Sequence, residues 1–78
     1  MHANPERAPG QPTAVDVHEL AADIRWRHRS LLRELRIELV EGGALLHGIA
    51  YSFYGKQVAQ HEVMRHSVVV ANRIVVGR

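Results

Sequence analysis

The sequence contains no cysteine, so neither a disulfide framework nor a thiolate metal site or thiol nucleophile is available to it. No apolar run approaches the roughly 20 residues that a helix needs to cross a bilayer. Residues 1–13 include no apolar segment of the kind that an export signal requires. We therefore expect a cytoplasmic protein, able to bind a membrane only at its periphery, unless a signal has already been removed.

Sequence signatures of catalysis and of metal binding are missing as well. His61 and His66 are five residues apart, on different faces of a helix, and no HExxH or other ligand spacing is present. The serines do not lie in a nucleophile elbow. Gly42-Gly43 does not open a helix, as a phosphate-binding loop would. We expect no enzyme activity, no cofactor, no metal and no small-molecule substrate.

The length of 78 residues indicates one small domain. A chain of this size buries only about 60% of the surface that its unfolded form exposes, so we expect modest stability. Residues 1–13 contain all three prolines and few large apolar groups, which is typical of a disordered tail. The sequence therefore predicts a tail at 1–13 and a folded domain at 14–78.

A hairpin is predicted in the middle of the chain. Leu35, Ile37 and Leu39 alternate with charged residues, the pattern of a half-buried strand. Gly42-Gly43 supplies the positive-φ positions that a tight turn demands, and a second strand follows at 44–51. Within it, Gly48 marks a place where another backbone comes close; we expect this to be the second helix.

Helices are predicted on either side of this hairpin, followed by one more strand. Residues 15–29 place apolar side chains at helical spacing, with Thr13 or Asp16 as the N-cap. Ser52 begins a second helix over 52–66, and the β-branched run 68–76 predicts a third strand. The fold class is therefore α+β, ordered α-β-β-α-β, with two helices covering one face of a three-stranded mixed sheet. Its strand order stays open.

A family resemblance rests on the order and spacing of these pieces. The residues follow the pattern I-x-L-x-x-G-G-A-L-L-x-G-x-A, then K-x-x-A and V-x-N-x-I-x-V. This pattern resembles the BON domain, named for bacterial osmotic-stress and nodulation proteins. The resemblance implies an α+β fold and a non-catalytic role in attachment to phospholipid membranes or partner proteins. It differs at His66-Ser67, where the family usually has Gly-Val. The residues that carry it are Ile37, Leu39, Gly42, Gly43, Ala44, Leu46, Gly48, Ala50, Lys56, Ala59, Val70, Asn72, Ile74 and Val76.

Basic residues concentrate at the end of the first predicted helix, although the net charge of the chain is only +2. Arginines beside an aromatic side chain can bind phosphates or the headgroup layer of an anionic membrane. The alternative is structural, because arginines at a helix C-terminus also stabilise the helix. The predicted binding residues are Arg25, Trp26, Arg27, Arg29 and Arg33.

The sheet face away from the helices is the second candidate surface. If both helices cover the side that bears Ile37, Leu46 and Ile74, the reverse side presents apolar residues to solvent or to a partner. Asn72 should face the helices and bond to nearby backbone, a structural role like that of Gly42, Gly43 and Gly48. The predicted interface residues are Val40, Leu45, His47, Ile49, Val69 and Val75.

Two functional hypotheses follow. The first is a binding or assembly module that associates with a protein partner or a phospholipid surface, including through self-association as a homo-oligomer. The alternative is a nucleic-acid-associating protein that uses the basic cluster from Arg25 to Arg36. A KH-type domain would need a GxxG loop between two helices, which the sequence lacks.

Overall fold

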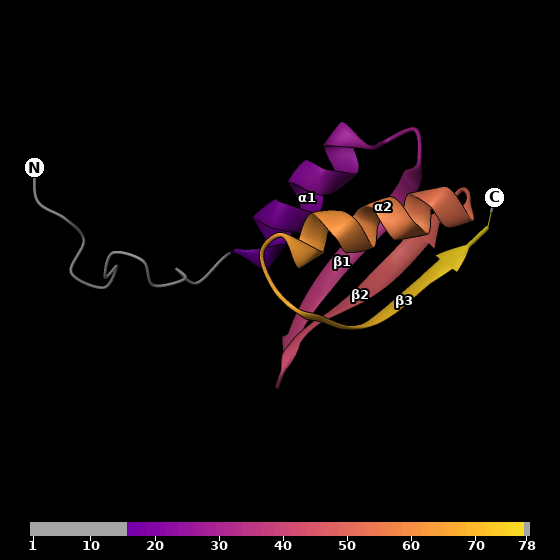
Figure 1. The fold of residues 1–78 in the computed structure, drawn as a ribbon. Coiled ribbons are helices and arrows are strands. Elements are labelled where there is room, and N and C mark those ends of the chain that lie inside the picture. The colour runs from indigo at the N-terminus through magenta and orange to yellow at the C-terminus, as the bar shows by residue number, and fades with distance from the viewer. Residues whose placement is uncertain (1–15, 78) are drawn as a thin grey trace, which may run out of the picture.

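The computed structural model describes residues 16–77, which form two helices and a three-stranded sheet. The elements follow one another as α1 (Val17–Arg27), β1 (Leu32–Val40), β2 (Gly43–Ala50), α2 (Phe53–Met64) and β3 (Val69–Val76). Both helices lie on the same side of the sheet (Figure 1). The predicted α+β fold and its element order are confirmed. The predicted tail at 1–13 and the alternative cap Thr13 lie outside the described residues.

Both helices begin at side chains that cap them. The Asp16 carboxylate accepts hydrogen bonds from the amides of His18 at 3.0 Å and Glu19 at 3.2 Å. The Ser52 hydroxyl accepts from the Gly55 amide at 3.1 Å. These bonds satisfy amide groups that have no partner inside the helix. Asp16 and Ser52 are therefore confirmed as caps, and both helices end two residues earlier than predicted.

The strand order is β1-β2-β3, which decides a question that the sequence left open. β1 and β2 pair antiparallel, and β3 pairs with β2 in parallel. The connection through α2 makes that parallel pairing feasible, since parallel neighbours need a crossover of a dozen residues or more. β2 is consequently the central strand, and β1 and β3 are both edges.

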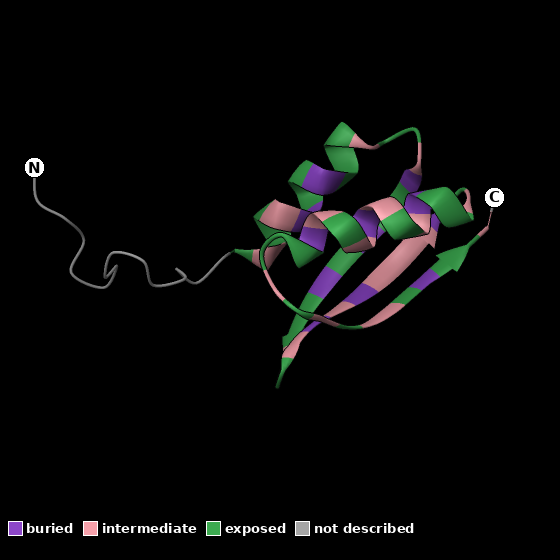
Figure 2. Cartoon of the chain, viewed as in Figure 1, coloured by how far each residue is buried: buried purple, intermediate pink, exposed green. Residues whose placement is uncertain are grey.

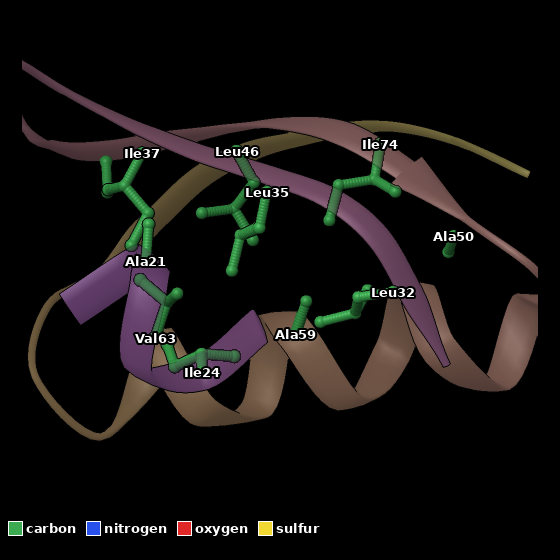
Figure 3. Close-up of a cluster of buried hydrophobic side chains, with 11 residues drawn as sticks. Ala21, Ile24, Leu32, Leu35, Ile37, Leu46, Ala50, Ala59, Val63 and Ile74 are labelled. Carbon is green, nitrogen blue, oxygen red and sulfur yellow. The ribbon is translucent and has the colours of Figure 1, made fainter. Parts of the chain in front are cut away.

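The buried positions lie on the facing sides of the sheet and the helices (Figure 2), and aliphatic side chains from these positions form the hydrophobic core (Figure 3). Leu46 on the central strand and Ile74 on β3 point toward the helices, as predicted. Across from them, Ile24 of α1 and Val63 of α2 close the core. The buried residues are Ala21, Ile24, Leu32, Leu35, Ile37, Ala44, Leu46, Ala50, Ala59, Val63 and Ile74.

The hairpin turn is displaced by one residue from its prediction. Val40 pairs with Gly43, so the two turn residues are Glu41 and Gly42, and Gly43 already belongs to β2. Gly42 has φ +92° and Gly43 has φ +150°, so the predicted positive φ of both glycines is confirmed, whereas Glu41 does not have a positive φ. The turn itself lies one position earlier than predicted, because a two-residue loop can use a single positive-φ glycine at its second position.

Gly48 lies against another backbone, as predicted, but that backbone belongs to β1 and not to α2. A Cβ atom added there would overlap the carbonyl oxygen of Glu34 and lie 3.0 Å from the Leu35 Cα. The contact occurs where the β1–β2 register shifts between Leu32 and Glu34. The φ of Gly48 is +146°, a conformation that side-chain-bearing residues rarely adopt. Glycine is therefore required at this position for two reasons.

The close approach of α2 is made by a different glycine. A Cβ atom on Gly55 would lie 2.5 Å from the carbonyl oxygen of Leu31, in the link between α1 and β1. The Tyr51 amide donates to that same oxygen at 3.0 Å. The first turn of α2 is thus held against the segment that leads into β1.

Asn72 is the polar residue that faces the helices from β3. Its Nδ2 donates to the Lys56 carbonyl and to the Gln60 Oε1, both at 3.1 Å. Its Oδ1 accepts from the Ile74 amide at 3.1 Å. The predicted backbone bonding is confirmed. The bonds from Asn72 to Lys56 and Gln60 hold the edge strand β3 against α2. A polar side chain thereby fixes the position of the otherwise apolar contact between this strand and this helix.

We expect Gly48→Ala to lower the free energy of unfolding by about 2–4 kcal/mol, because the strained φ and the overlap with Glu34 add together. Thermal unfolding followed by circular dichroism would measure the loss. Gly77→Ala is the matched control, since a Cβ atom there meets nothing within 4 Å. Equal melting temperatures for the two variants would contradict this account of Gly48.

Candidate functional site

Several chain segments meet at one end of the domain, where α1 ends and α2 begins. The Tyr51 amide bonds to the Leu31 carbonyl at 3.0 Å, which joins the α1–β1 link to the β2–α2 link. The Gly77 amide bonds to the Ala50 carbonyl at 2.8 Å, so β2 and β3 also finish here. Figure 1 shows these connections at the end of the molecule that carries the C-terminus.

Every aromatic side chain of the protein belongs to this end, and none of them is in the core. The sequence has one tryptophan, two tyrosines and one phenylalanine. They are Trp26 in the last turn of α1 and Tyr51, Phe53 and Tyr54 at the start of α2, with exposed fractions between 46% and 71%. Aromatic side chains usually dominate a core because of their large apolar area. We call this set of four residues the aromatic end.

Arginines lie beside the aromatic end. The Arg29 guanidinium sits 4.2 Å from the centroid of the Trp26 ring and donates to the Trp26 carbonyl at 2.8 Å. The Arg25 Nε donates to the Arg33 carbonyl at 2.9 Å. Within residues 16–77, no carboxylate lies within 4.0 Å of the side chains of Arg25, Arg29 or Arg33. Trp26 and three of the four predicted arginines therefore lie where α1 ends and β1 begins, and the charges of these three arginines have no carboxylate partner among the described residues.

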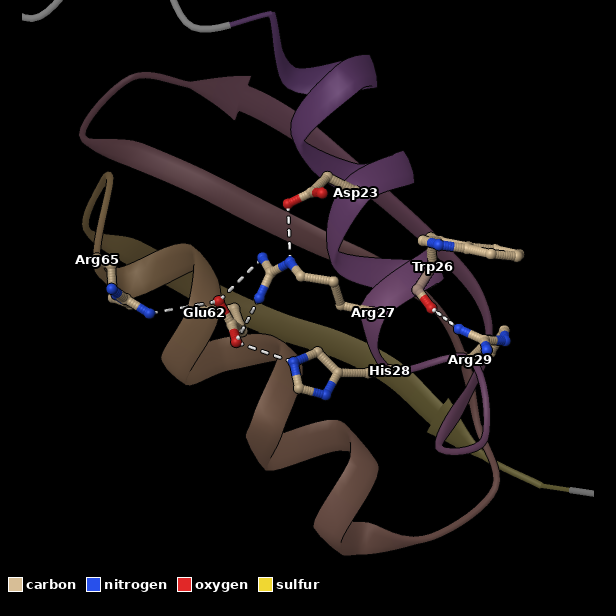
Figure 4. Close-up of polar contacts among 7 residues, drawn as sticks. All are labelled: Asp23, Trp26, Arg27, His28, Arg29, Glu62 and Arg65. Atoms are coloured by element: carbon tan, nitrogen blue, oxygen red, sulfur yellow. Dashed lines mark hydrogen bonds and ion pairs between the residues drawn. The ribbon is translucent and has the colours of Figure 1, made fainter.

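Arg27, the fifth predicted binding residue, has a different environment. Its Nε donates to the Asp23 carboxylate at 2.9 Å, one helical turn earlier. Its two terminal nitrogens reach the Glu62 carboxylate at 3.1 and 3.3 Å (Figure 4). Arg27 thereby joins α1 to α2, and its charge is compensated inside the chain.

Glu62 is the residue on which this junction converges, and sequence reasoning missed it. His28 Nε2 lies 2.9 Å from the Glu62 Oε2, and Arg65 Nη1 lies 3.8 Å from the Oε1. The Glu62 side chain is only 15% exposed. The Arg27 hydrogen bond, and next the His28 hydrogen bond, lower the pKa of Glu62 below its ordinary value although burial opposes the shift. Arg27 and His28 are 35 and 34 residues away in the chain, so no spacing rule reveals these two contacts, and only Arg65 lies at helical spacing from Glu62.

Acid should weaken the fold through Glu62. Because the pKa of this group is lower in the folded chain than in the unfolded one, its contribution is present above the ordinary glutamate pKa, about 4.3, and is lost as the pH falls through the lowered value. We expect Glu62→Gln to be less stable than the parent at pH 7 and to lose less stability below pH 4, measured by urea unfolding.

Glu41→Gln is the control for that experiment. Glu41 is exposed in the hairpin turn and has no cation within 4.0 Å among the described residues. Its variant should follow the parent over the whole pH range. An equal pH response of Glu62→Gln and the parent would show that the junction does not stabilise the fold.

The sheet face away from the helices carries most of the predicted interface residues. Leu45, His47 and Ile49 alternate along the central strand and are half-buried there. Val75 is exposed next to Ile49 on β3, and Val40 is half-buried beside the hairpin turn. We call this surface the open face.

Val69 is not part of the open face, and that prediction is wrong. It pairs with the buried Ala44 and packs against the core on the helix side. The β2–β3 register shifts after Ala44, so that Leu45 pairs with Ala71 and Val70 is the extra residue. Alternation along β3 is broken at this irregularity, which inverts the expected direction of Val69.

Charged residues flank the apolar centre of the open face. Arg36 and Arg73 lie on either side of His47, and the His47 Nε2 lies 3.0 Å from the Glu38 carboxylate. The open face therefore combines an apolar centre with charged residues at its sides, and it stays a predicted interface.

Metal sites and cavities are the remaining candidates for a functional site. Residues 16–77 contain no group of three or more histidine, cysteine or acidic side chains that could hold a metal ion. A shallow depression of about 380 Å³ lies beside the aromatic end, lined by Tyr54, His61 and Arg65 among others. No helix within the described range is long and apolar enough to cross a bilayer.

Comparison of the chain with protein-family models, with curated proteins and with solved structures finds no match. The resemblance to BON domains therefore stays a prediction that rests on the residue pattern alone.

Proposed function

We propose that this protein is a non-catalytic module that attaches to anionic phospholipid surfaces through its aromatic end. The observation that carries the proposal is that all four aromatic side chains are exposed where α1 ends and α2 begins. On the Trp26 side of this end, Arg29 stacks on the Trp26 ring and Arg25 bonds to the Arg33 carbonyl, and none of these three arginines has a carboxylate within 4.0 Å among the described residues. A fold that has these side chains but leaves them out of its core exposes apolar area at a cost, and a partner that covers them removes that cost.

The chemistry of the bilayer interface fits both halves of this surface. Tryptophan and tyrosine favour the headgroup layer, where an apolar ring and a polar edge are both satisfied. Arginine places its apolar stem along the interface and its charge beside phosphate. Three arginines near an anionic surface contribute roughly 3 kcal/mol, about as much as burying one large side chain. Binding should therefore need both parts and be reversible.

Nucleic acid is the competing ligand for the same arginines. Its affinity comes mainly from neutralised phosphates, so it needs many uncompensated cations. Here the net charge is only +2, and Arg27 is held by Asp23 and Glu62. The aromatic end and the arginines beside it comprise four exposed aromatic side chains and three uncompensated arginines, a balance that favours a lipid headgroup layer over single-stranded nucleic acid. The BON resemblance implies the same kind of attachment.

Trp26 gives a direct experiment, because it is the only tryptophan and belongs to the proposed site. We expect its fluorescence to shift to shorter wavelength with vesicles of phosphatidylcholine and phosphatidylglycerol, and to stay unchanged with phosphatidylcholine alone. Phe53→Ser together with Tyr54→Ser should weaken vesicle binding at least fivefold, and so should Arg25→Gln with Arg29→Gln and Arg33→Gln.

The matched control removes charge elsewhere. Arg73 lies on the open face, and Arg73→Gln should retain most of the vesicle affinity. If the Trp26 fluorescence does not shift in wavelength with anionic vesicles, the proposal is wrong. Tight, steeply salt-dependent binding of single-stranded RNA without vesicle binding would replace it by the nucleic-acid alternative.

A further inference from the structure

We propose that β1 is an assembly edge, on which two copies of this chain pair antiparallel about Ile37 to form one continuous six-stranded sheet. β1 pairs only with β2, so the described chain leaves its other edge open. An open edge presents unpaired backbone groups and is a template for another strand. The partner is identified by the side chains of β1 itself.

The charges on β1 are self-complementary in this register. With Ile37 opposite its own copy, Arg36 of each chain lies opposite Glu38 of the other, which gives two reciprocal pairs. Directly opposite side chains have Cβ atoms about 4.5–5.5 Å apart, within reach of an ion pair. Within residues 16–77, no carboxylate lies within 4.0 Å of Arg36. Glu38 uses Oε1 for His47 at 3.0 Å, and its second oxygen can accept from Arg36.

The apolar side of β1 supports the same register. Leu39 follows the core residue Ile37 by two positions, so both side chains point to the same face of the strand, yet Leu39 is 58% exposed. Pairing about Ile37 places Leu39 of each copy opposite Leu35 of the other, beside an existing core. This pairing uses residues 34–40, the regular part of the strand. The alternative centre at Leu35 would include the irregularity between Leu32 and Glu34.

The other edge does not offer this complementarity. β3 carries one charged residue, Arg73, so two antiparallel copies of β3 would have like charges and no acid to compensate them. Its register also shifts near Val70. In the β1 pairing, the aromatic ends lie at opposite ends of the dimer because the paired strands run antiparallel. Assembly and lipid binding are therefore separate properties, which fail separately.

Native mass spectrometry and light scattering at micromolar concentrations test the pairing. We expect a dimer of twice the 8.8 kDa chain mass. Arg36→Glu and Glu38→Arg should each weaken the dimer at least tenfold, and the double variant, which exchanges the charges, should restore it. Arg73→Glu is the control on the other edge and should leave the dimer intact. Circular dichroism confirms that each variant is folded.

Cysteine cross-linking tests the register, since the natural chain has no cysteine. A mixture of Arg36→Cys and Glu38→Cys chains should form a mixed disulfide, because opposite residues have Cα atoms about 4.5–5.5 Å apart. Neither variant alone should, because identical positions lie diagonally, about 7–8 Å apart. Cross-linking of Glu34→Cys with Arg36→Cys instead would show the Leu35 centre and overturn the register.

Three results would overturn the assembly edge itself. One is a monomer at every concentration up to the millimolar range. Another is a dimer that the single charge reversals leave unchanged. The third is a dimer that Leu45→Lys abolishes while both charge reversals leave it intact, which would place the interface on the open face.

Discussion

Close packing of α2 against the rest of the chain is the constraint on which this fold depends. Gly55 touches the Leu31 carbonyl, and the fully buried Ala59 and Ala50 keep the space between helix and sheet small. Asn72 then fixes how α2 lies along β3 through bonds to Lys56 and Gln60. The core is built of aliphatic side chains and alanines, and the four aromatic side chains, Trp26, Tyr51, Phe53 and Tyr54, lie outside it on the surface.

The charged residues divide into those that hold the fold and those that remain available. Glu62 contacts Arg27, His28 and Arg65 and joins the two helices, and its own side chain is mostly shielded from solvent. Arg25, Arg29 and Arg33 are left without carboxylates among the described residues. The same short helix end therefore serves stability on one side and presents charge on the other. The sequence alone does not tell which arginine stabilises the helix junction and which one offers a charge to a partner, because the acids that pair with Arg27 are identified only in the folded chain.

Much of the fold could be predicted because its signals are local. Asp16 and Ser52 bond to amides two or three residues away, so the helix starts were visible in the sequence. The alternation of Leu35 and Ile37 likewise depends only on strand geometry. The predictions failed where a contact came from elsewhere. The sequence predicts a contact between Gly48 and α2, but the Glu34 backbone lies against Gly48. The alternation of β3 predicts Val69 on the open face, but an irregularity beside Val70 turns Val69 toward the core.

The sequence by itself determined the element order, the helix caps and the α+β class, because periodicity and capping act within a few residues. Only the tertiary structure decided that β3 joins β2, that Glu62 is the junction of the helices, and that the four aromatic side chains share one end. Those relations link residues tens of positions apart. They form only when the chain has folded, since the packing of α2 on the sheet brings the first turn of α2 against the α1–β1 link.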